Sequence, residues 1–283
     1  MTNTTTTYLS IANNLARYQK LESEQSAVKT ATDYYTSNIG KVTSVDQLLG
    51  NYRLLSYALQ AYGLGDQIHN TALIKKVLEE GTSSPSALAN TLPNVNWKAF
   101  VNAFNFAATG SAAPTSSASV ATTTADYTEH QLESSQSDPG VELALYFARV
   151  APTITNSYSI LADNNLLQVV QTIFGLAPTA NASEIDKEAK QISALMPISD
   201  LQNPEKLKSL VERFTANYDF KYGPASGSSS SLTVNDGNTP STQSAASTIL
   251  AGVVSSNSAA LATQSSYTPL ISPALLAGLS LGG

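Results

Sequence analysis

The sequence has no cysteine, and this absence excludes disulfides, thiol catalysis and cysteine-based metal sites together. It has only two histidines, His69 and His130, and neither has a second histidine at metal-ligand spacing. We expect both imidazoles to be solvated. No stretch has the GxxxxGK(S/T) pattern of a phosphate loop. The sequence therefore predicts no catalytic residue, no cofactor, no metal site and no enzymatic activity. A deep polar pocket that holds several carboxylates or histidines would reverse this last expectation.

Charge and long apolar runs are scarce as well. Only 13% of the 283 residues are charged, the net charge is −6, and Lys75-Lys76 is the one adjacent basic pair. Since binding to a phosphate backbone needs clustered lysine and arginine, a nucleic-acid partner is not expected. No run approaches the roughly eighteen apolar residues of a membrane helix, and the N-terminus lacks the basic and apolar regions of a secretory signal peptide. We expect a soluble protein that, if it leaves the cytoplasm, does so without a cleaved signal.

One stretch of the chain occurs twice. Residues 33–64 match residues 145–176 without a gap, at an offset of 112, so that Gly63 corresponds to Gly175. Apolar residues recur at the helical period in both copies. A second block follows each copy and matches at an offset of 110. The duplication predicts an all-α fold built from two pseudo-repeated helical units.

Helix ends are marked in the same way in both copies. Ser44 opens a helix with a Ser-x-x-Gln capping box, and Asn156 stands at the matching position. Gly63 ends the helix that Ser44 opens, and Leu64 is expected to fold back onto Leu59. Aromatic residues later in each copy follow the helical period and are expected to lie in the core. The residues with predicted helix-end or core roles are Ser44, Leu59, Gly63, Leu64, Trp97, Phe104, Asn156, Gly175, Leu176 and Phe214.

The duplication divides the chain into five parts. We predict one long N-terminal helix over residues 1–40, a first helical repeat over 41–109, a flexible Ser/Thr-rich linker over 110–139, a second helical repeat over 140–221 and a flexible tail over 222–283. The N-terminal helix packs on the core or pairs with a partner along its polar middle. The tail carries short apolar segments, which dock either on this protein's own surface or on a partner.

Arg53 stands beside apolar neighbours on the repeated helix, where a polar side chain calls for an explanation. Its counterpart in the second copy is Asn165, and Asn51 is matched by Asp163. We expect these polar groups to bridge helices within the duplicated core. Contact of Arg53 with a partner or a ligand is the alternative.

The residues of the first copy resemble a known family. The order Tyr34-Tyr35, Arg53-Leu54-Leu55, Ala61-Tyr62-Gly63-Leu64 and then Trp97 to Phe104 is similar to that of domain-of-unknown-function family 1217, over residues 25–220. The family pattern favours an acidic residue two positions before the arginine and a phenylalanine before Gly-Leu. This chain has both only in the second copy, as Asp163 and Phe174. The resemblance implies a bacterial protein, often encoded among flagellar genes, and carries over no catalytic residue.

The resemblance and the composition together favour a flagellum-associated, non-enzymatic protein, either a structural component or an assembly accessory. A cysteine-free chain rich in Ser, Thr, Ala and Asn suits export through a narrow conduit. The chain lacks the terminal motifs of rod, hook or filament subunits, which argues against a standard axial protein. The alternative is a cytoplasmic adaptor or chaperone that binds a partner helix between the two repeats. In either case we expect the partners to be proteins, whether flagellar components or a second copy of this chain.

Overall fold

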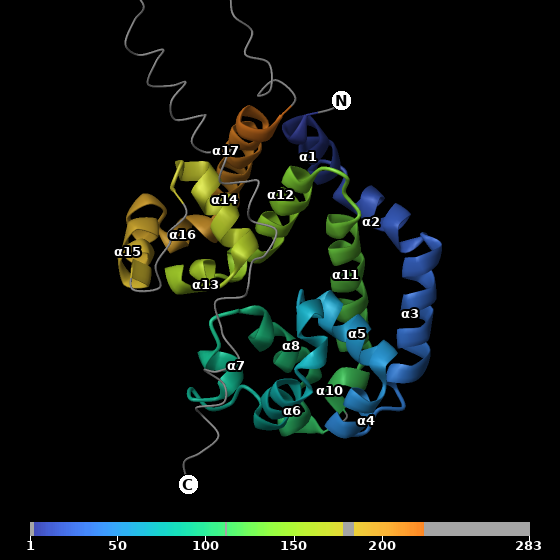
Figure 1. Cartoon of the computed structure of the whole chain (residues 1–283). Helices are drawn as coiled ribbons and strands as arrows, with labels where there is room; N and C mark the ends of the chain where they lie inside the picture. The colour runs from blue at the N-terminus through green and yellow to red at the C-terminus, as the bar shows by residue number, and fades with distance from the viewer. Residues whose placement is uncertain (1–2, 111, 178–183, 224–283) are drawn as a thin grey trace, which may run out of the picture. The chain divides into compact units, whose positions relative to one another are not determined.

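The computed structural model describes residues 3–110, 112–177 and 184–223 (Figure 1). All regular structure in these three ranges is helical and none is strand, so the predicted all-α class is confirmed. The predicted tail over residues 222–283 lies outside this description from residue 224 onward. None of the helices in the described ranges is both long enough and apolar enough to cross a membrane.

The predicted single helix over residues 1–40 is wrong, because the structure has three helices there. These are α1 (Thr4–Ala12), α2 (Leu15–Ser23) and α3 (Ser26–Ile39). At the first break, Asn14 Nδ2 donates to the Ser10 carbonyl at 3.0 Å and so competes with the helical bonds of the backbone. At the second break, Gln25 has extended dihedral angles, φ −60° and ψ 134°. Periodicity does not reveal such breaks, because the apolar stripe continues across them.

The first predicted repeat begins with two helices where the sequence pattern predicts one. Its elements are α4 (Val45–Gly50), α5 (Tyr52–Ala61), η1 (Gly65–His69), α6 (Thr71–Glu80), α7 (Leu88–Thr91), α8 (Asn96–Phe104) and α9 (Phe106–Thr109). Asn51 has ψ 91°, and its side chain accepts from Leu54 N at 3.1 Å. This one residue therefore ends α4 and caps α5.

The second predicted repeat has a similar order of helices. Its elements are α12 (Pro139–Val150), η2 (Ala151–Thr153), α13 (Ser157–Leu161), α14 (Asn164–Phe174), α15 (Ile185–Leu195), α16 (Ile198–Leu201) and α17 (Pro204–Tyr222). Asp163 interrupts the chain between α13 and α14 and accepts from Asn165 N and Leu166 N. Asp163 thus caps α14 in the way that Asn51 caps α5.

The predicted linker over residues 110–139 is also wrong. It contains α10 (Ala112–Thr115) and α11 (Ser117–Ser134). Although α11 is rich in serine and threonine, it buries Tyr127 and Leu132. Thr128 Oγ1 donates to the Thr124 carbonyl at 2.9 Å, so this hydroxyl is satisfied inside the helix. Burial against other helices here outweighs a weak intrinsic helix propensity, which composition alone does not show.

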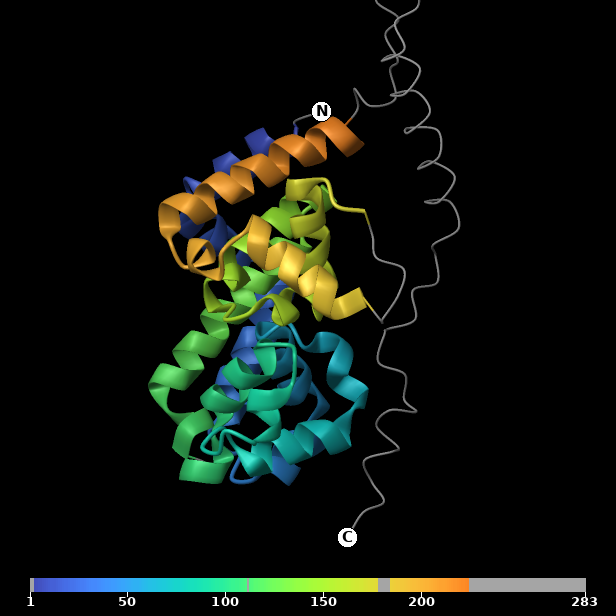
Figure 2. The same cartoon turned by 90° about the vertical axis from the view of Figure 1, so that its left-hand side faces the viewer.

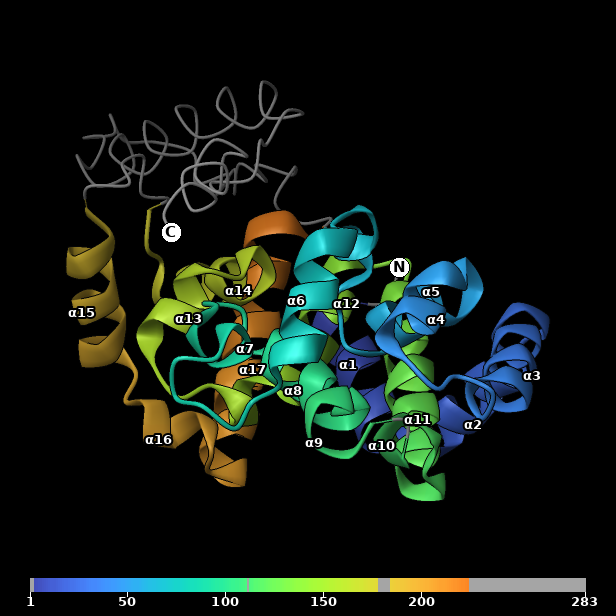
Figure 3. The ribbon, with the colours of Figure 1, turned by 90° about the horizontal axis from the view of Figure 1, so that it is seen from below.

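Two hydrophobic cores hold the helices together, and we call them core 1 and core 2. Core 1 lies among α3 to α9, and core 2 lies among α1 and α12 to α17. Figure 1 shows α11 beside α5 and also beside α2 and α3, and Figure 3 shows α8 and α10 near its start. Tyr127 of α11 belongs to core 1 and Leu132 to core 2. The segment predicted as a linker is therefore the helix that both cores share.

The N-terminal helices divide between the two cores. Tyr8 and Ile11 of α1 are buried in core 2, where α1 packs against α12 and α17 (Figure 2). Val28, Tyr35 and Ile39 of α3 are buried in core 1. The chain therefore starts in core 2, crosses to core 1 through α2, and returns to core 2 through α11.

Candidate functional site

The residues predicted to begin helices lie at helix starts in the structure. Ser44 Oγ accepts from Gln47 N at 3.3 Å, and Asn156 Oδ1 accepts from Ser159 N at 3.0 Å. One detail of the predicted capping box is wrong. Gln47 Oε1 accepts from the backbone and the hydroxyl of Thr43, one residue earlier than the expected partner.

The two predicted helix stops have the geometry that favours glycine. Gly63 has φ +67° and Gly175 has φ +65°, in the left-handed region. Leu64 N donates back to the Leu59 carbonyl at 2.7 Å, which closes a Schellman turn. Leu176 N makes the corresponding backbone bond after α14. All five residues serve helix ends, and none of them carries a group that could react.

The predicted aromatic residues lie inside the cores. Trp97 and Phe104 are buried in core 1, and Phe214 is buried in core 2. Phe104 packs against Phe100 with ring centroids 4.9 Å apart, within the range of favourable aromatic pairs. These rings stabilise the fold and offer no exposed face to a ligand.

Arg53 lies on the surface, and not inside a core as the sequence predicts. Its guanidinium carbon lies 3.7 Å above the centroid of the Tyr34 ring, a cation–π contact. The Tyr34 hydroxyl and the Asn51 side chain are hydrogen-bonded to each other at 3.1 to 3.3 Å. Exposed Tyr52 follows Asn51 in the chain. Arg53 therefore bridges α5 to α3 by stacking and forms no ion pair with any residue of the described ranges.

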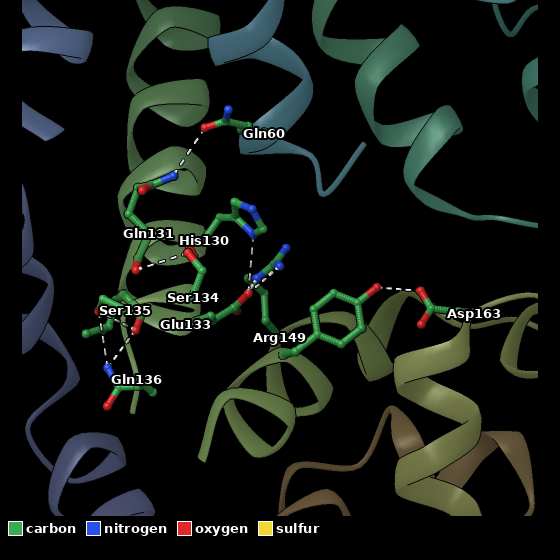
Figure 4. Close-up of polar contacts among 11 residues, drawn as sticks. Gln60, His130, Gln131, Glu133, Ser134, Ser135, Gln136, Arg149 and Asp163 are labelled. Carbon is green, nitrogen blue, oxygen red and sulfur yellow. Dashed lines mark hydrogen bonds and ion pairs between the residues drawn. The ribbon is translucent and has the colours of Figure 1, made fainter. Parts of the chain in front are cut away.

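The tertiary structure brings together a charged cluster that the sequence reading missed. Asp126, Glu129, His130 and Glu133 recur at threes and fours along α11, so they share one face of the helix. This face meets Arg149 near the end of α12 (Figure 4). The spacing is visible in the sequence and could have signalled the cluster, but it falls in the segment predicted to be a linker.

The centre of the cluster is a buried ion pair between Glu133 and Arg149. Nε donates to Oε1 at 2.6 Å and Nη2 donates to Oε2 at 2.8 Å, which is the bidentate geometry of the strongest arginine–carboxylate pairs. The side chains are only 4% and 17% exposed, respectively. Burial opposes ionisation of Glu133, but the hydrogen bonds from Arg149, together with the favourable interactions of the nearby Arg149 and His130 side chains, outweigh it and hold the pKa of Glu133 below its usual value. The pair therefore stays charged and joins α11 to α12.

The sequence predicts a solvated His130, but the structure buries most of this side chain. Its side chain is 27% exposed, and Nδ1 lies 3.8 Å from Glu133 Oε2. This distance is too long for a hydrogen bond. His69, the other histidine, is exposed in η1.

Asp126 and Glu129 flank the ion pair without taking part in it. Both side chains are half-buried, and neither has a hydrogen bond or ion pair with any residue in the described part of the chain. Burial raises the pKa of both carboxyls, although the nearby Arg149 guanidinium opposes this. The cluster thus places three carboxyls near a single arginine. Arg149 is paired with Glu133, so Asp126 and Glu129 have no ion pair of their own among the described residues.

A second polar contact lies beside the cluster. The Tyr146 hydroxyl donates to Asp163 Oδ2 at 2.5 Å, so Asp163 both caps α14 and holds a tyrosine of α12 (Figure 4). Burial, and then the Asp163 carboxylate, raise the pKa of Tyr146. This tyrosine therefore remains a neutral hydrogen-bond donor.

The contacts of the cluster hold helices α11 and α12 together. Glu133 and Arg149 are paired with each other, and no three histidine or carboxylate side chains among the described residues are arranged so that they could hold a metal ion. A shallow groove of about 420 Å³ lies between α8 and α11, but no charged side chain lines it and it does not reach the ion pair. Among the described residues, the cluster and the groove are thus two separate features.

Comparison with known proteins places the chain in a family. A family described as "Protein of unknown function (DUF1217)" matches residues 61–207. The X-ray crystal structure of a structural-genomics target from Agrobacterium tumefaciens is similar, with a TM-score of 0.70 and 37% sequence identity. The match covers 77% of this chain and 93% of that one. No curated protein matches. The chain belongs to the DUF1217 family of proteins of unknown function.

Proposed function

We propose that this protein is a non-enzymatic, flagellum-associated protein that acts through protein–protein contacts, as a structural component or as an assembly accessory. The observation that carries the non-enzymatic part is the Glu133–Arg149 pair. It uses the most buried carboxylate of the α11 cluster and the Arg149 guanidinium to join two helices. The flagellar part rests on the family resemblance and on a cysteine-free composition that suits export.

We also propose that the chain arose by internal duplication at an offset of 112 residues. The order of helices from α3 to α8 is similar to the order from α12 to α17. The best support is one matched polar motif: Tyr34 bonds to Asn51, which caps α5, and Tyr146 bonds to Asp163, which caps α14. Each tyrosine lies 17 residues before its partner. A shared ancestor explains this agreement better than chance, because the bond joins the same two helices in each repeat.

The second candidate is a cytoplasmic adaptor or chaperone. The exposed Arg53–Tyr34 stack beside Tyr52 favours it, since arginine and tyrosine dominate the energetic hot spots of interfaces. The Asn51 bond holds Tyr34 in place, so little side-chain entropy remains to be lost when a partner binds.

Fractionation of the flagellated host tests the proposal. A tagged chain at its own locus should appear in the culture medium or in purified hook–basal bodies, and a deletion strain should lose motility or normal flagella. A strictly cytosolic chain, with normal flagella in the deletion strain, would rule out the flagellar proposal.

A matched pair of arginine variants tests the adaptor. With a partner identified by cross-linking, Arg53→Ala should weaken binding by at least about tenfold, the effect of a hot spot worth 1.4 kcal/mol or more. Arg17→Ala, which removes an exposed arginine from α2, should leave binding unchanged. Equal effects of the two variants would remove the argument for the Arg53 surface.

A further inference from the structure

Helix α1 packs in core 2, although helices α3 to α9 of the same half of the chain belong to core 1. Tyr8 and Ile11 are buried in core 2, against α12 and α17, whereas α3 belongs to core 1. Between them runs α2, none of whose nine side chains is buried. The tether between α1 and core 1 is therefore α2, which contacts α11 through exposed and half-buried side chains only, so α1 could leave its position without opening core 1.

The start of α1 is bound by a side chain of α17 and by the N-cap residue of α12, and we call this binding site the seat. Asp219 accepts from Thr4 N at 2.7 Å, from Thr5 N at 3.1 Å and from the Thr5 hydroxyl at 2.8 Å. Asp138 accepts from the Thr4 hydroxyl at 2.8 Å. A carboxylate at this position satisfies free N–H groups and interacts favourably with the helix dipole. Burial opposes ionisation of Asp219, but these hydrogen bonds outweigh it and lower its pKa.

The seat also fits the helix in shape. A Cβ on Gly140 of α12 would lie 2.7 Å from Thr4 Cγ2 and 2.5 Å from Tyr218 Cδ1, so a larger residue would clash with both α1 and α17. The carboxylates and this close approach together make a specific site for one helix start.

The start of α11 makes the reverse crossing. Tyr127 stacks on Tyr57 of core 1 with centroids 3.8 Å apart, and Thr123 Oγ1 lies 3.2 Å from the Tyr62 hydroxyl. At the repeat offset of 112, Ile11 of α1 corresponds to Thr123 of α11, and both are buried. The leading helix of each repeat thus packs on the core of the other repeat. A single chain already contains the reciprocal exchange that domain-swapped dimers show between chains.

We propose that α1 is an exchangeable helix and that its partner in trans is a second copy of this chain. When α1 leaves its seat on α12 and α17, α1 of another copy fills that seat with the same bonds to Asp138 and Asp219. The proposal goes beyond the proposed function and holds for a flagellar and for a cytosolic protein alike. A short tether gives α1 an effective concentration of about a millimolar, so the exchange becomes visible when chains refold together near that concentration.

The absence of cysteine allows a direct test. Full chains carrying Thr5→Cys and full chains carrying Asp219→Cys are unfolded together, refolded at high concentration and oxidised. We expect a disulfide-linked dimer that contains one chain of each kind, because the side chains of residues 5 and 219 are in hydrogen-bond contact. The Thr5→Cys, Asp219→Cys double variant at low concentration should form the disulfide within one chain, which shows that the two cysteines are close enough to be linked.

Two controls keep the test decisive. Asp33→Cys, an exposed position on α3, replaces Asp219→Cys in a parallel mixture and should give no linked dimer. The unsubstituted chain, refolded in the same way, should show a dimer fraction by light scattering that grows with concentration and survives dilution. Intrachain closure without linked dimers would overturn the proposal. Equal cross-linking by the Asp33→Cys chains, or an unsubstituted chain that is monomeric at every concentration, would also overturn it.

Discussion

Replacement of Glu133 by glutamine isolates the energetic role of the buried pair. The substitution keeps the shape of the side chain and removes its charge, so the Arg149 guanidinium, 17% exposed, loses its paired carboxylate and keeps only the more distant charges of Asp126 and Glu129. Removal of one partner from a buried ion pair costs about 3–5 kcal/mol. Because the glutamine carbonyl can still accept one of the two hydrogen bonds, we expect a loss near the lower end, about 3 kcal/mol. Domains of this kind have about 5–15 kcal/mol of stability, so the loss is a large fraction of the total.

Urea unfolding followed by circular dichroism at pH 7 measures this loss. With a slope of about 2 kcal/mol per molar urea, the midpoint should fall by about 1.5 M. The pH dependence follows from the lowered pKa of Glu133: the stability that the carboxylate contributes is present above its unfolded pKa and is lost as the pH falls through the folded one. The difference between the variant and the parent should therefore shrink below about pH 4.

A surface pair provides the matched control. Lys29 and Asp33 lie 2.7 Å apart but are 63% and 62% exposed, so Asp33→Asn should change stability by no more than about 0.5 kcal/mol. The double variant Glu133→Leu, Arg149→Met should recover most of the loss, since it removes both buried charges. The reasoning is refuted if Glu133→Gln costs no more than Asp33→Asn.

Three further predictions concern single residues. Burial raises the pKa of Glu129, so any stability that this group contributes is present below its unfolded pKa and is lost as the pH rises. Glu129→Gln should therefore raise the urea midpoint at pH 7 and change it little at pH 4. Gly175→Ala should lower the free energy of unfolding by about 1–2 kcal/mol because of the positive φ alone. Gly63→Ala should lower it further, because the added Cβ would also meet a side chain at 3.1 Å. Gly50→Ala, the control, should be neutral or stabilising by up to about 1 kcal/mol. Asp219→Asn should lower amide-exchange protection over residues 4–12 before other helices are affected, and uniform loss along the chain would contradict the local seat.

Local features of the fold could be predicted because their partners are close in sequence. Ser44 and Asn156 each bond to an amide three residues away, and Gly63 is required by a turn that closes within six residues. Such contacts form in the same way whatever packs around them. The breaks at Asn51 and Asp163 are also local and could have been predicted from their cap residues. A continuous apolar stripe concealed them.

The role of α11 could not be predicted in the same way. Its serines and threonines have weak helix propensity, and its helical state depends on burial of Tyr127 and Leu132 in two separate cores. Without that burial, the same composition is typical of a linker. The charged face of α11 was concealed for the same reason, since its spacing has meaning only once the segment is known to be a helix.

The sequence by itself therefore determined the all-α class, the helix starts at Ser44 and Asn156, the stops at Gly63 and Gly175, and several residues that fill the cores, because these depend on period and on neighbours a few positions away. Only the tertiary structure decided that Glu133 meets Arg149, that α1 lies in core 2, and that α11 is shared by both cores. These contacts join residues up to 215 positions apart. Their energies come from desolvation and packing, which depend on what surrounds a side chain in three dimensions.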